Sequence, residues 1–324
     1  MSFSYEPSLL LAAPGEGFEV VTKLSNHSWR FIPYVQMAEY LPECTTVNAT
    51  GAVLDKEVVA GEIRHISKVY LMPRSHLLRR VPVSIEARGR HLFSGATLRG
   101  GDFLGLEENH KKFNVFSEVV VYPAPAEEDY IKEVTGGFIG DISVRRFIVE
   151  DPILTQGFRE YTGREPMKSI AWQQSFHKPG GQLMVKNSDY TTELSVSVVL
   201  NIESKDKQQI EKCLSITHRV CLILEERRVK YDFFSNIVAR GSNGNWAYIS
   251  EGIGRAHIQR ILEGLGRAAY HSAESCEALI ARTLKTQSTK KSIIFITPGD
   301  EHFKEQETSL VISASKGEWH EFSA

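Results

Sequence analysis

The sequence contains little cysteine and no long apolar run, and these two features exclude several classes of protein. Four cysteines occur in 324 residues, and none belongs to a Cys-x-x-Cys pair. This usage argues against a disulfide framework and a zinc site, and it is typical of a reducing compartment. No segment approaches the roughly 20 apolar residues that a membrane-spanning helix needs. We therefore expect a cytoplasmic chain, or the soluble part of a membrane-anchored protein, without a transmembrane helix of its own.

Neither sign of charge dominates the chain. The 38 basic and 40 acidic residues give a formal net charge of -2, and the two kinds are interspersed along the sequence. A phosphate backbone is bound by a stripe of unpaired cations, which this pattern does not supply. The charge distribution therefore predicts no nucleic-acid partner.

Sequence motifs for several common chemistries are also missing. The chain contains no phosphate-binding G-x-x-x-x-G-K-[ST] loop, no H-E-x-x-H zinc motif and no G-x-S-x-G nucleophile elbow. The pair Gly252 and Gly254 precedes a predicted helix but lacks the third glycine of a dinucleotide-binding turn. We therefore expect no cofactor and no catalytic residues, and an enzyme of unrecognised type remains one alternative.

The first third of the chain shows the two-residue period of β-strands. Short alternating runs separated by turn residues continue from Gly17 to about Pro123, and no stretch of comparable length keeps a helical period. The pattern predicts an antiparallel β-sandwich over residues 1–125. In the first run, one face carries Phe18, Val20, Thr22 and Leu24.

A change of composition marks the end of this region. The segment Pro123–Asp129 consists of Pro, Ala and acidic residues and is typical of an exposed connection between domains. Residues 130–190 follow without a clear period and are rich in Gly, Arg and aromatic residues. We expect residues 126–190 to be an irregular segment that bridges two domains.

The last third of the chain alternates strands and helices. Residues 194–200 form a nearly continuous apolar run, and residues 206–228 follow with apolar side chains at helical spacing, including Cys213 and Cys221. Further strands are predicted at 229–239, 292–297 and 310–314, and helices at 255–269 and 273–285. The order predicts a small doubly wound α/β domain over residues 191–324, and hence an α+β chain of two domains.

Two stretches carry motifs in a defined order. The first comprises Arg88–Phe93, a turn at Gly101–Leu106 and the strand end Val120–Pro123. The second places Arg159 and Tyr161 before the turn Gly163-Arg164-Glu165-Pro166, which precedes Lys168, Ile170, Trp172, Ser175 and the run Leu183–Lys186. Together they resemble the domain of unknown function 58 family, in which a β-domain is fused to a von Willebrand factor A-like domain. The acid of the family's glycine–acid turn is displaced here by one position.

The second stretch, residues 158–186, is called the signature segment below. Its candidate binding residues are charged and aromatic: Arg159, Tyr161, Arg164, Glu165, Lys168, Trp172 and Lys186. One interpretation is that this segment joins the two domains, in which case Trp172 is buried. The other is that its exposed face binds a partner, as loops on a rigid scaffold often do.

The resemblance also implies a metal site whose ligands are missing. A von Willebrand factor A domain normally holds a divalent cation through Asp-x-Ser-x-Ser after its first strand and an Asp after a later strand. Here these positions hold Asn201, Glu203, Lys205 and Pro298. Because hard cations prefer carboxylate oxygens, we expect a degenerate site without metal. An alternative site would use Glu203, Ser204, Asp206 and Asp300.

The resemblance implies a function in protein interaction. Members of this family are bacterial proteins, often accessory partners of MoxR-type AAA+ ATPases in envelope-associated systems. We therefore expect a non-catalytic interaction module. The alternative is a metal-dependent, ligand-binding von Willebrand factor A domain with a rearranged cation site.

Overall fold

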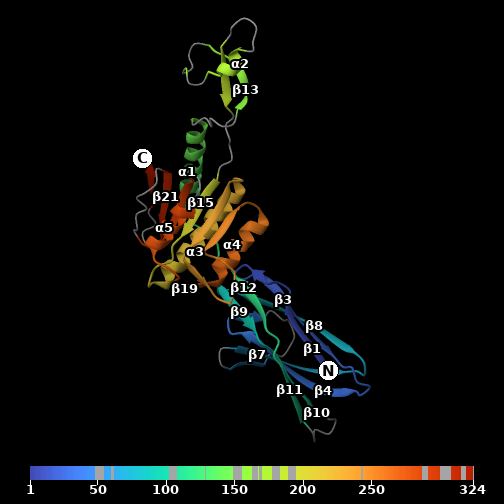
Figure 1. Cartoon of the computed structure of the whole chain (residues 1–324). Coiled ribbons are helices and arrows are strands. Elements are labelled where there is room, and N and C mark those ends of the chain that lie inside the picture. The colour runs from blue at the N-terminus through green and yellow to red at the C-terminus, as the bar shows by residue number, and fades with distance from the viewer. Residues whose placement is uncertain are drawn as a thin grey trace.

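The computed structural model describes residues 1–47, 55–59, 62–101, 108–127, 129–148, 155–162, 167, 170–176, 183–188, 195–241, 244–286, 291–299, 308–314 and 319–323. Figure 1 shows a β-sandwich, an α/β domain and a small unit formed by the signature segment, with the α/β domain between the other two. No described helix is long and apolar enough to cross a membrane.

The β-sandwich is built mainly from antiparallel sheets, and its buried side chains form two hydrophobic clusters. Alternate residues of β3 are buried, as the sequence predicts, and they include Phe18, Val20, Thr22 and Leu24. The sheet orders are β1-β3-β8-β5 and β11-β10-β4-β7-β6, with a further sheet β2-β12-β9 in which β2 and β12 are parallel. The strands are β1 Ser2–Pro7, β2 Leu11–Ala12, β3 Gly17–Ser25, β4 Ile32–Pro42, β5 Thr45–Val47, β6 Asp55–Val59, β7 Glu62–Leu71, β8 His76–Ile85, β9 Gly89–Phe93, β10 Gly95–Gly101, β11 Glu108–Phe113 and β12 Ser117–Val121.

A polar cluster lies inside the sandwich among the apolar side chains. The Glu39 carboxylate accepts a hydrogen bond from the Thr22 hydroxyl and lies 2.7 Å from Nδ1 of His65. Arg79 is 3.0 Å from the other ring nitrogen; because a guanidinium can only donate, that nitrogen is the acceptor and Nδ1–H donates to Glu39. Each oxygen of the buried Glu39 carboxylate is thereby paired, one with Thr22 and the other with His65.

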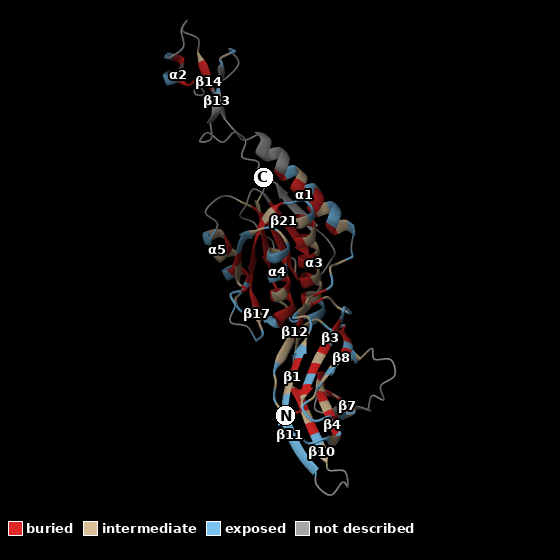
Figure 2. Cartoon of the chain, turned by 90° about the vertical axis from the view of Figure 1, so that its right-hand side faces the viewer, coloured by how far each residue is buried: buried red, intermediate tan, exposed pale blue. Residues whose placement is uncertain are grey.

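The α/β domain is centred on a mixed sheet of order β18-β16-β15-β20-β21-β22. Its inner pairings are parallel, whereas β18 and β22 pair antiparallel at the two edges. Figure 2 shows the inner strands buried, which explains their continuous apolar runs. The strands are β15 Ser195–Leu200, β16 Lys230–Ser235, β18 Tyr248–Gly252, β20 Ser292–Thr297, β21 Thr308–Ser313 and β22 Trp319–Ser323, with a separate pair formed by β17 Ile237–Ala239 and β19 Ala268–Ser272.

Helices cover both faces of this sheet, as a doubly wound domain requires. On one face α3 (Lys207–Glu226) and α4 (Arg255–Arg267) share a core with Val198 and Ile294, and α5 (Cys276–Thr286) packs on the other face against Val199 and Phe295. Cys213 and Cys221 are buried in α3, and burial raises the pKa of both thiols to about 12. They therefore act as small core residues.

The expectation that residues 130–190 are irregular is wrong for the first third of that range. Asp129–Ile148 form a 20-residue helix, α1, whose residues Ile131, Phe138 and Ile142 are buried in the same core as α3. The apolar positions of α1 are interrupted by glycines, which weakens the helical period in the sequence. Packing against α3 stabilises the helix instead.

The β-sandwich and the α/β domain are joined through Arg88, which precedes β9. Its side chain is 7% exposed and makes a bidentate contact with Glu211 of α3, at 2.7 to 2.9 Å. Nη1 of Arg88 also donates to the carbonyl oxygens of Leu265 and Ala268, at 2.9 and 3.0 Å. A guanidinium has enough donors to satisfy all of these acceptors at once.

The end of α4 lies directly against β12 at the same interface. A Cβ atom on Gly266 would lie 2.5 Å from a methyl carbon of Val120, so a larger residue would push the domains apart. Beside it, Arg267 donates to Glu118 at 2.5 Å, and Arg90 donates to the other oxygen of the same carboxylate. The hydrogen bond from Arg267 is the main cause of the lowered pKa of Glu118.

We predict that Arg88→Ala destabilises the protein by about 1–3 kcal/mol, because the carbonyl groups of Leu265 and Ala268 lose their donor and Glu211 loses its ion-pair partner. The matched control is Arg80→Ala, since Arg80 is 62% exposed and contacts Glu19 at 3.8 Å. Its expected cost is below about 1 kcal/mol. Denaturant unfolding monitored by circular dichroism compares the two variants, and equal costs would show that Arg88 does not fix the interface.

A second prediction concerns His218 of α3, whose Nδ1 lies 2.8 Å from the Pro123 carbonyl oxygen. Burial lowers its pKa from the ordinary value of 6.5. The unfolded chain therefore binds this proton more readily, so the contribution of His218 to stability is present above pH 6.5 and is lost as the pH falls below it. His218→Asn should show a shallower loss of melting temperature between about pH 6.5 and 5 than the wild type. The exposed control His110→Asn should keep the wild-type slope.

Candidate functional site

The carboxyl edge of the α/β sheet is where domains of this architecture commonly bind ligands. The chain passes from β15 to β16 on one side and later returns to β20 on the other side of β15. In open α/β sheets, ligands bind in the crevice at such a reversal of strand order. The residues that follow β15, β16 and β20 therefore form the candidate cation site.

A network of hydrogen-bonded, neutral polar side chains lies at this edge. Asn236 donates to the side-chain oxygen of Asn201 at 2.7 Å, and Asn201 donates to the Thr297 hydroxyl at 3.2 Å. The side-chain oxygen of Asn236 accepts from the backbone of Ile202 at 2.9 Å, and its amide also donates to the Glu274 carbonyl at 3.2 Å. Asn201, Asn236 and Thr297 are at most 1% exposed. The network ties the ends of three parallel strands together.

The four positions at which the family resemblance implies metal ligands have other roles in this structure. Asn201 belongs to the buried network, and the Glu203 carboxylate accepts from the backbone N–H of Cys276 at the start of α5, at 2.7 Å. Lys205 is exposed and Pro298 is buried. Within the residues that the structure describes, no three His, Cys, Asp or Glu side chains are grouped to hold a metal ion.

Two residues of the alternative cation site, Ser204 and Asp206, form hydrogen bonds within the chain. Ser204 donates to Gln209 at 3.0 Å, and Asp206 caps α3 by accepting from the backbone of Gln208 at 2.9 Å. Asp300 lies outside the described residues. Of the four residues in this set, the three that are described are thus engaged in local structure.

Sequence reasoning missed two residues that organise this edge. Asn236 follows β16 inside what the sequence reads as one continuous strand, so no local signal distinguishes it. Arg282 of α5 donates to the Ser235 and Ala247 carbonyls, at 3.0 and 2.9 Å, and pairs with Glu274. Both bring together elements that are far apart in sequence, which local periodicity does not reveal.

The signature segment forms a separate small unit rather than the junction between domains. Strands β13 (Thr155–Glu160) and β14 (Met184–Ser188) pair antiparallel, and the short helix α2 (Trp172–Phe176) packs beside them. Figure 1 shows this unit on the side of the α/β domain away from the β-sandwich. The interpretation that the segment joins the two large domains is therefore wrong, because Arg88 and its neighbours make that contact.

The small unit has a few buried residues and a defined hydrogen-bond pattern. Ile170, Ala171, Met184 and Val185 are at most 6% exposed. The Ser175 hydroxyl accepts from the backbone of Met184 at 2.8 Å and donates to the Ala171 carbonyl at 2.9 Å. This pattern holds α2 against β14.

The candidate binding residues occupy different parts of this unit. Arg159 and Lys186 lie in β13 and β14, and the half-buried Tyr161 donates its backbone N–H to the Leu183 carbonyl at 2.8 Å. Trp172 begins α2 and is 52% exposed, whereas it would be buried if the segment joined the two domains. Arg164, Glu165 and Lys168 lie outside the described residues.

Exposed apolar side chains gather in the same unit. Phe158, Met167, Trp172 and Phe176 are 42%, 69%, 52% and 85% exposed. A unit this small exposes them because its own core is too small to bury them. Large exposed apolar side chains in one small unit are typical of a surface that binds another protein.

Comparison with known proteins yields distant structural likenesses. No protein-family model matches the chain, and no curated protein is significantly similar to it. A CARDB domain from Pyrococcus furiosus, solved with di-metal ions, is 11% identical with a TM-score of 0.25 and covers 37% of this chain and 87% of its own. A non-cellulosomal cohesin from Archaeoglobus fulgidus is 13% identical with a TM-score of 0.27. The match covers 40% of this chain and 96% of the cohesin. A cohesin module of a Clostridium perfringens family 33 glycoside hydrolase is 14% identical with a TM-score of 0.27. The match covers 37% of this chain and 98% of the module.

We predict that Asn236→Ala destabilises the α/β domain by about 1–3 kcal/mol, because it leaves the Ile202 N–H and the Asn201 side-chain oxygen without one of their partners. Asn245→Ala is the control, since Asn245 is exposed and its side chain accepts from the nearby backbone N–H of Ala247. Thermal unfolding of both variants tests the role of the network. An unchanged midpoint for Asn236→Ala would show that the edge is not held together in this way.

Proposed function

We propose that this chain is a non-catalytic protein-interaction module that binds its partner through the signature segment. The observation that carries the proposal is the exposure of Phe158, Met167, Trp172 and Phe176 in a unit that hydrogen bonds hold in a fixed shape. Aromatic side chains held in a fixed position lose little entropy on binding and commonly dominate the energy of an interface.

The proposed partner is a MoxR-type AAA+ ATPase of a bacterial envelope-associated system. This assignment rests on the resemblance of the signature segment to the domain of unknown function 58 family. The same resemblance implies that residues 191–324 are a von Willebrand factor A-like domain. The strand order β16-β15-β20-β21 with helices on both faces supports that part of the proposal. The neutral network at Asn201 supports a degenerate cation site.

The test is a pull-down of a co-expressed MoxR-type ATPase by the double variant Trp172→Ser and Phe176→Ser. Binding should fall by at least about tenfold, since each residue would lose more than roughly 1 kcal/mol of contact. Both side chains are exposed, so the free energy of unfolding should change by less than about 0.5 kcal/mol per substitution. Phe116→Ser is the control, because Phe116 is 74% exposed but lies in the β-sandwich.

Two outcomes would contradict the proposal. Full capture by the double variant would show that this surface does not bind the ATPase. A large loss of stability in the double variant would show that these residues are structural. Repeating the capture with a chelator tests the metal-dependent alternative, which requires that binding is lost when divalent cations are removed.

A further inference from the structure

The end of the β-sandwich that points away from the α/β domain exposes a second apolar surface. Trp29, Phe31, Tyr70 and Met72 are 74%, 46%, 63% and 53% exposed. They lie in or beside the connection between β3 and β4 and the connection between β7 and β8, which meet at this end. The rings of Phe31 and Tyr70 are 6.4 Å apart. We call these four residues the aromatic tip.

The aromatic tip is held on a rigid base. Asn26 is 2% exposed, and its side-chain amide donates to the carbonyl oxygens of Arg30 and Met72, at 2.8 and 3.0 Å. The backbone N–H of Arg74 donates to the Ser28 carbonyl at 3.0 Å. Asn26 therefore clamps the two connections together, so the exposed side chains are displayed by a fixed scaffold.

Basic side chains surround the aromatic tip. Lys23, Arg30, Arg74 and Lys111 are exposed, and the guanidinium of Arg74 lies 3.7 Å from the centre of the Trp29 ring. None of the four has a carboxylate partner among the residues that the structure describes. These charges are therefore available to a negatively charged surface.

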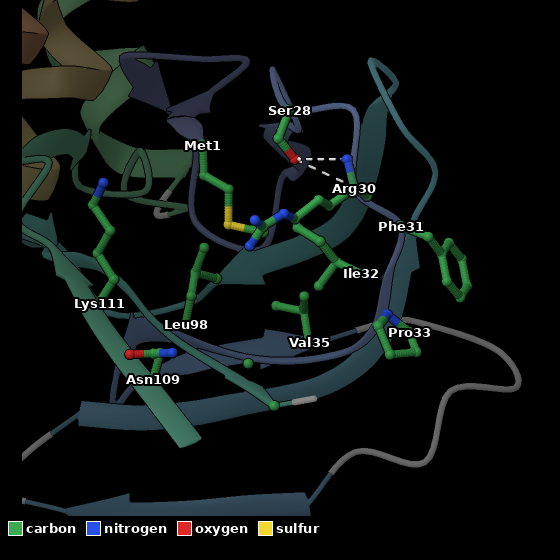
Figure 3. A pocket seen from close by; sticks show the side chains of 12 residues that line it. Met1, Ser28, Arg30, Phe31, Ile32, Pro33, Val35, Leu98, Asn109 and Lys111 are labelled. Carbon is green, nitrogen blue, oxygen red and sulfur yellow. Dashed lines mark hydrogen bonds between the residues drawn. The ribbon is translucent and has the colours of Figure 1, made fainter. Parts of the chain in front are cut away.

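Two hollows lie between these side chains. The larger, of about 580 Å³, has a floor of Ile32, Val35 and Leu98, and Figure 3 shows Arg30 reaching across it toward Met1. The second, of about 410 Å³, is polar and is lined by Lys23, Ser25, Asn26, His27, Arg74, Ser75 and His76. Neither lining contains an acidic residue. One hollow suits an apolar chain and the other an anionic group.

We propose that the aromatic tip and its basic surround bind the surface of a bilayer that contains anionic phospholipids. Trp and Tyr prefer the level of the lipid headgroups, and Lys and Arg beside them can contact phosphate while their stems lie along apolar surface. A single-stranded nucleic acid would instead need aromatic side chains spaced along a basic groove. Here the apolar side chains lie together at a strand end, which favours shallow insertion into a membrane.

The test is flotation of the full chain with vesicles of phosphatidylglycerol and phosphatidylcholine, compared with vesicles of phosphatidylcholine alone. The chain should float with the anionic vesicles, and added salt should weaken the binding. Arg30→Ser with Arg74→Ser should lower the partition coefficient by about 25-fold, since each cation near an anionic membrane contributes roughly fivefold. Trp29→Ser with Phe31→Ser should lower it by on the order of tenfold.

Phe116→Ser is the matched control for the apolar pair, because Phe116 is as exposed as Trp29, at 74%. This control should leave the partition coefficient unchanged. Trp29→Phe should keep the binding but remove the blue shift of tryptophan fluorescence that vesicles cause. Melting temperatures close to that of the wild type would show that the variants are folded.

Three results would overturn the proposal. The chain could fail to float with either kind of vesicle, or the tip variants could bind as well as the wild type. The third is displacement of the chain by soluble glycerol phosphate without any fluorescence shift from Trp29. That result would assign the polar hollow to a free phosphate compound rather than to a lipid.

Discussion

The contact between Arg88 and Glu211 is the interaction on which the arrangement of the two large domains depends. The guanidinium is almost fully buried between β9 and α3, and it also satisfies carbonyl groups near the end of α4. Removing Arg88 leaves the carbonyl groups of Leu265 and Ala268 without their donor, so separating the two domains costs free energy. Gly266 lets the backbones approach closely enough for these bonds to form. The contact therefore sets the direction in which the sandwich leaves the α/β domain.

This arrangement leaves two exposed apolar surfaces at separate parts of the molecule. One belongs to the signature segment, around Trp172, and the other to the free end of the β-sandwich, around Trp29. Between them, Asn201, Asn236 and Thr297 hydrogen-bond to one another at the edge where α/β domains commonly bind ligands. The two proposed binding surfaces therefore lie far apart along the chain, in different domains.

Periodicity in the sequence predicted the fold where local patterns decide it. The alternating side chains around Val20 and the buried run before Asn201 placed strands correctly, and the helix containing Cys213 was found from its spacing. The glycines of α1 obscured a helix that packing stabilises, and the spacing of the signature segment does not reveal where it lies in space. The role of Asn236 likewise depends on contacts with residues distant in the sequence.

The most direct test of the rigid arrangement is the distance between spin labels placed on Phe116 of the sandwich and Glu277 of α5, in a chain whose exposed Cys44 is replaced. Both side chains are exposed, so the labels should not disturb the packing. Pulsed electron resonance should give one narrow distance distribution, which should broaden when Arg88 is also changed to Ala. A broad distribution in the chain that retains Arg88 would contradict the account, because the two domains would then move independently.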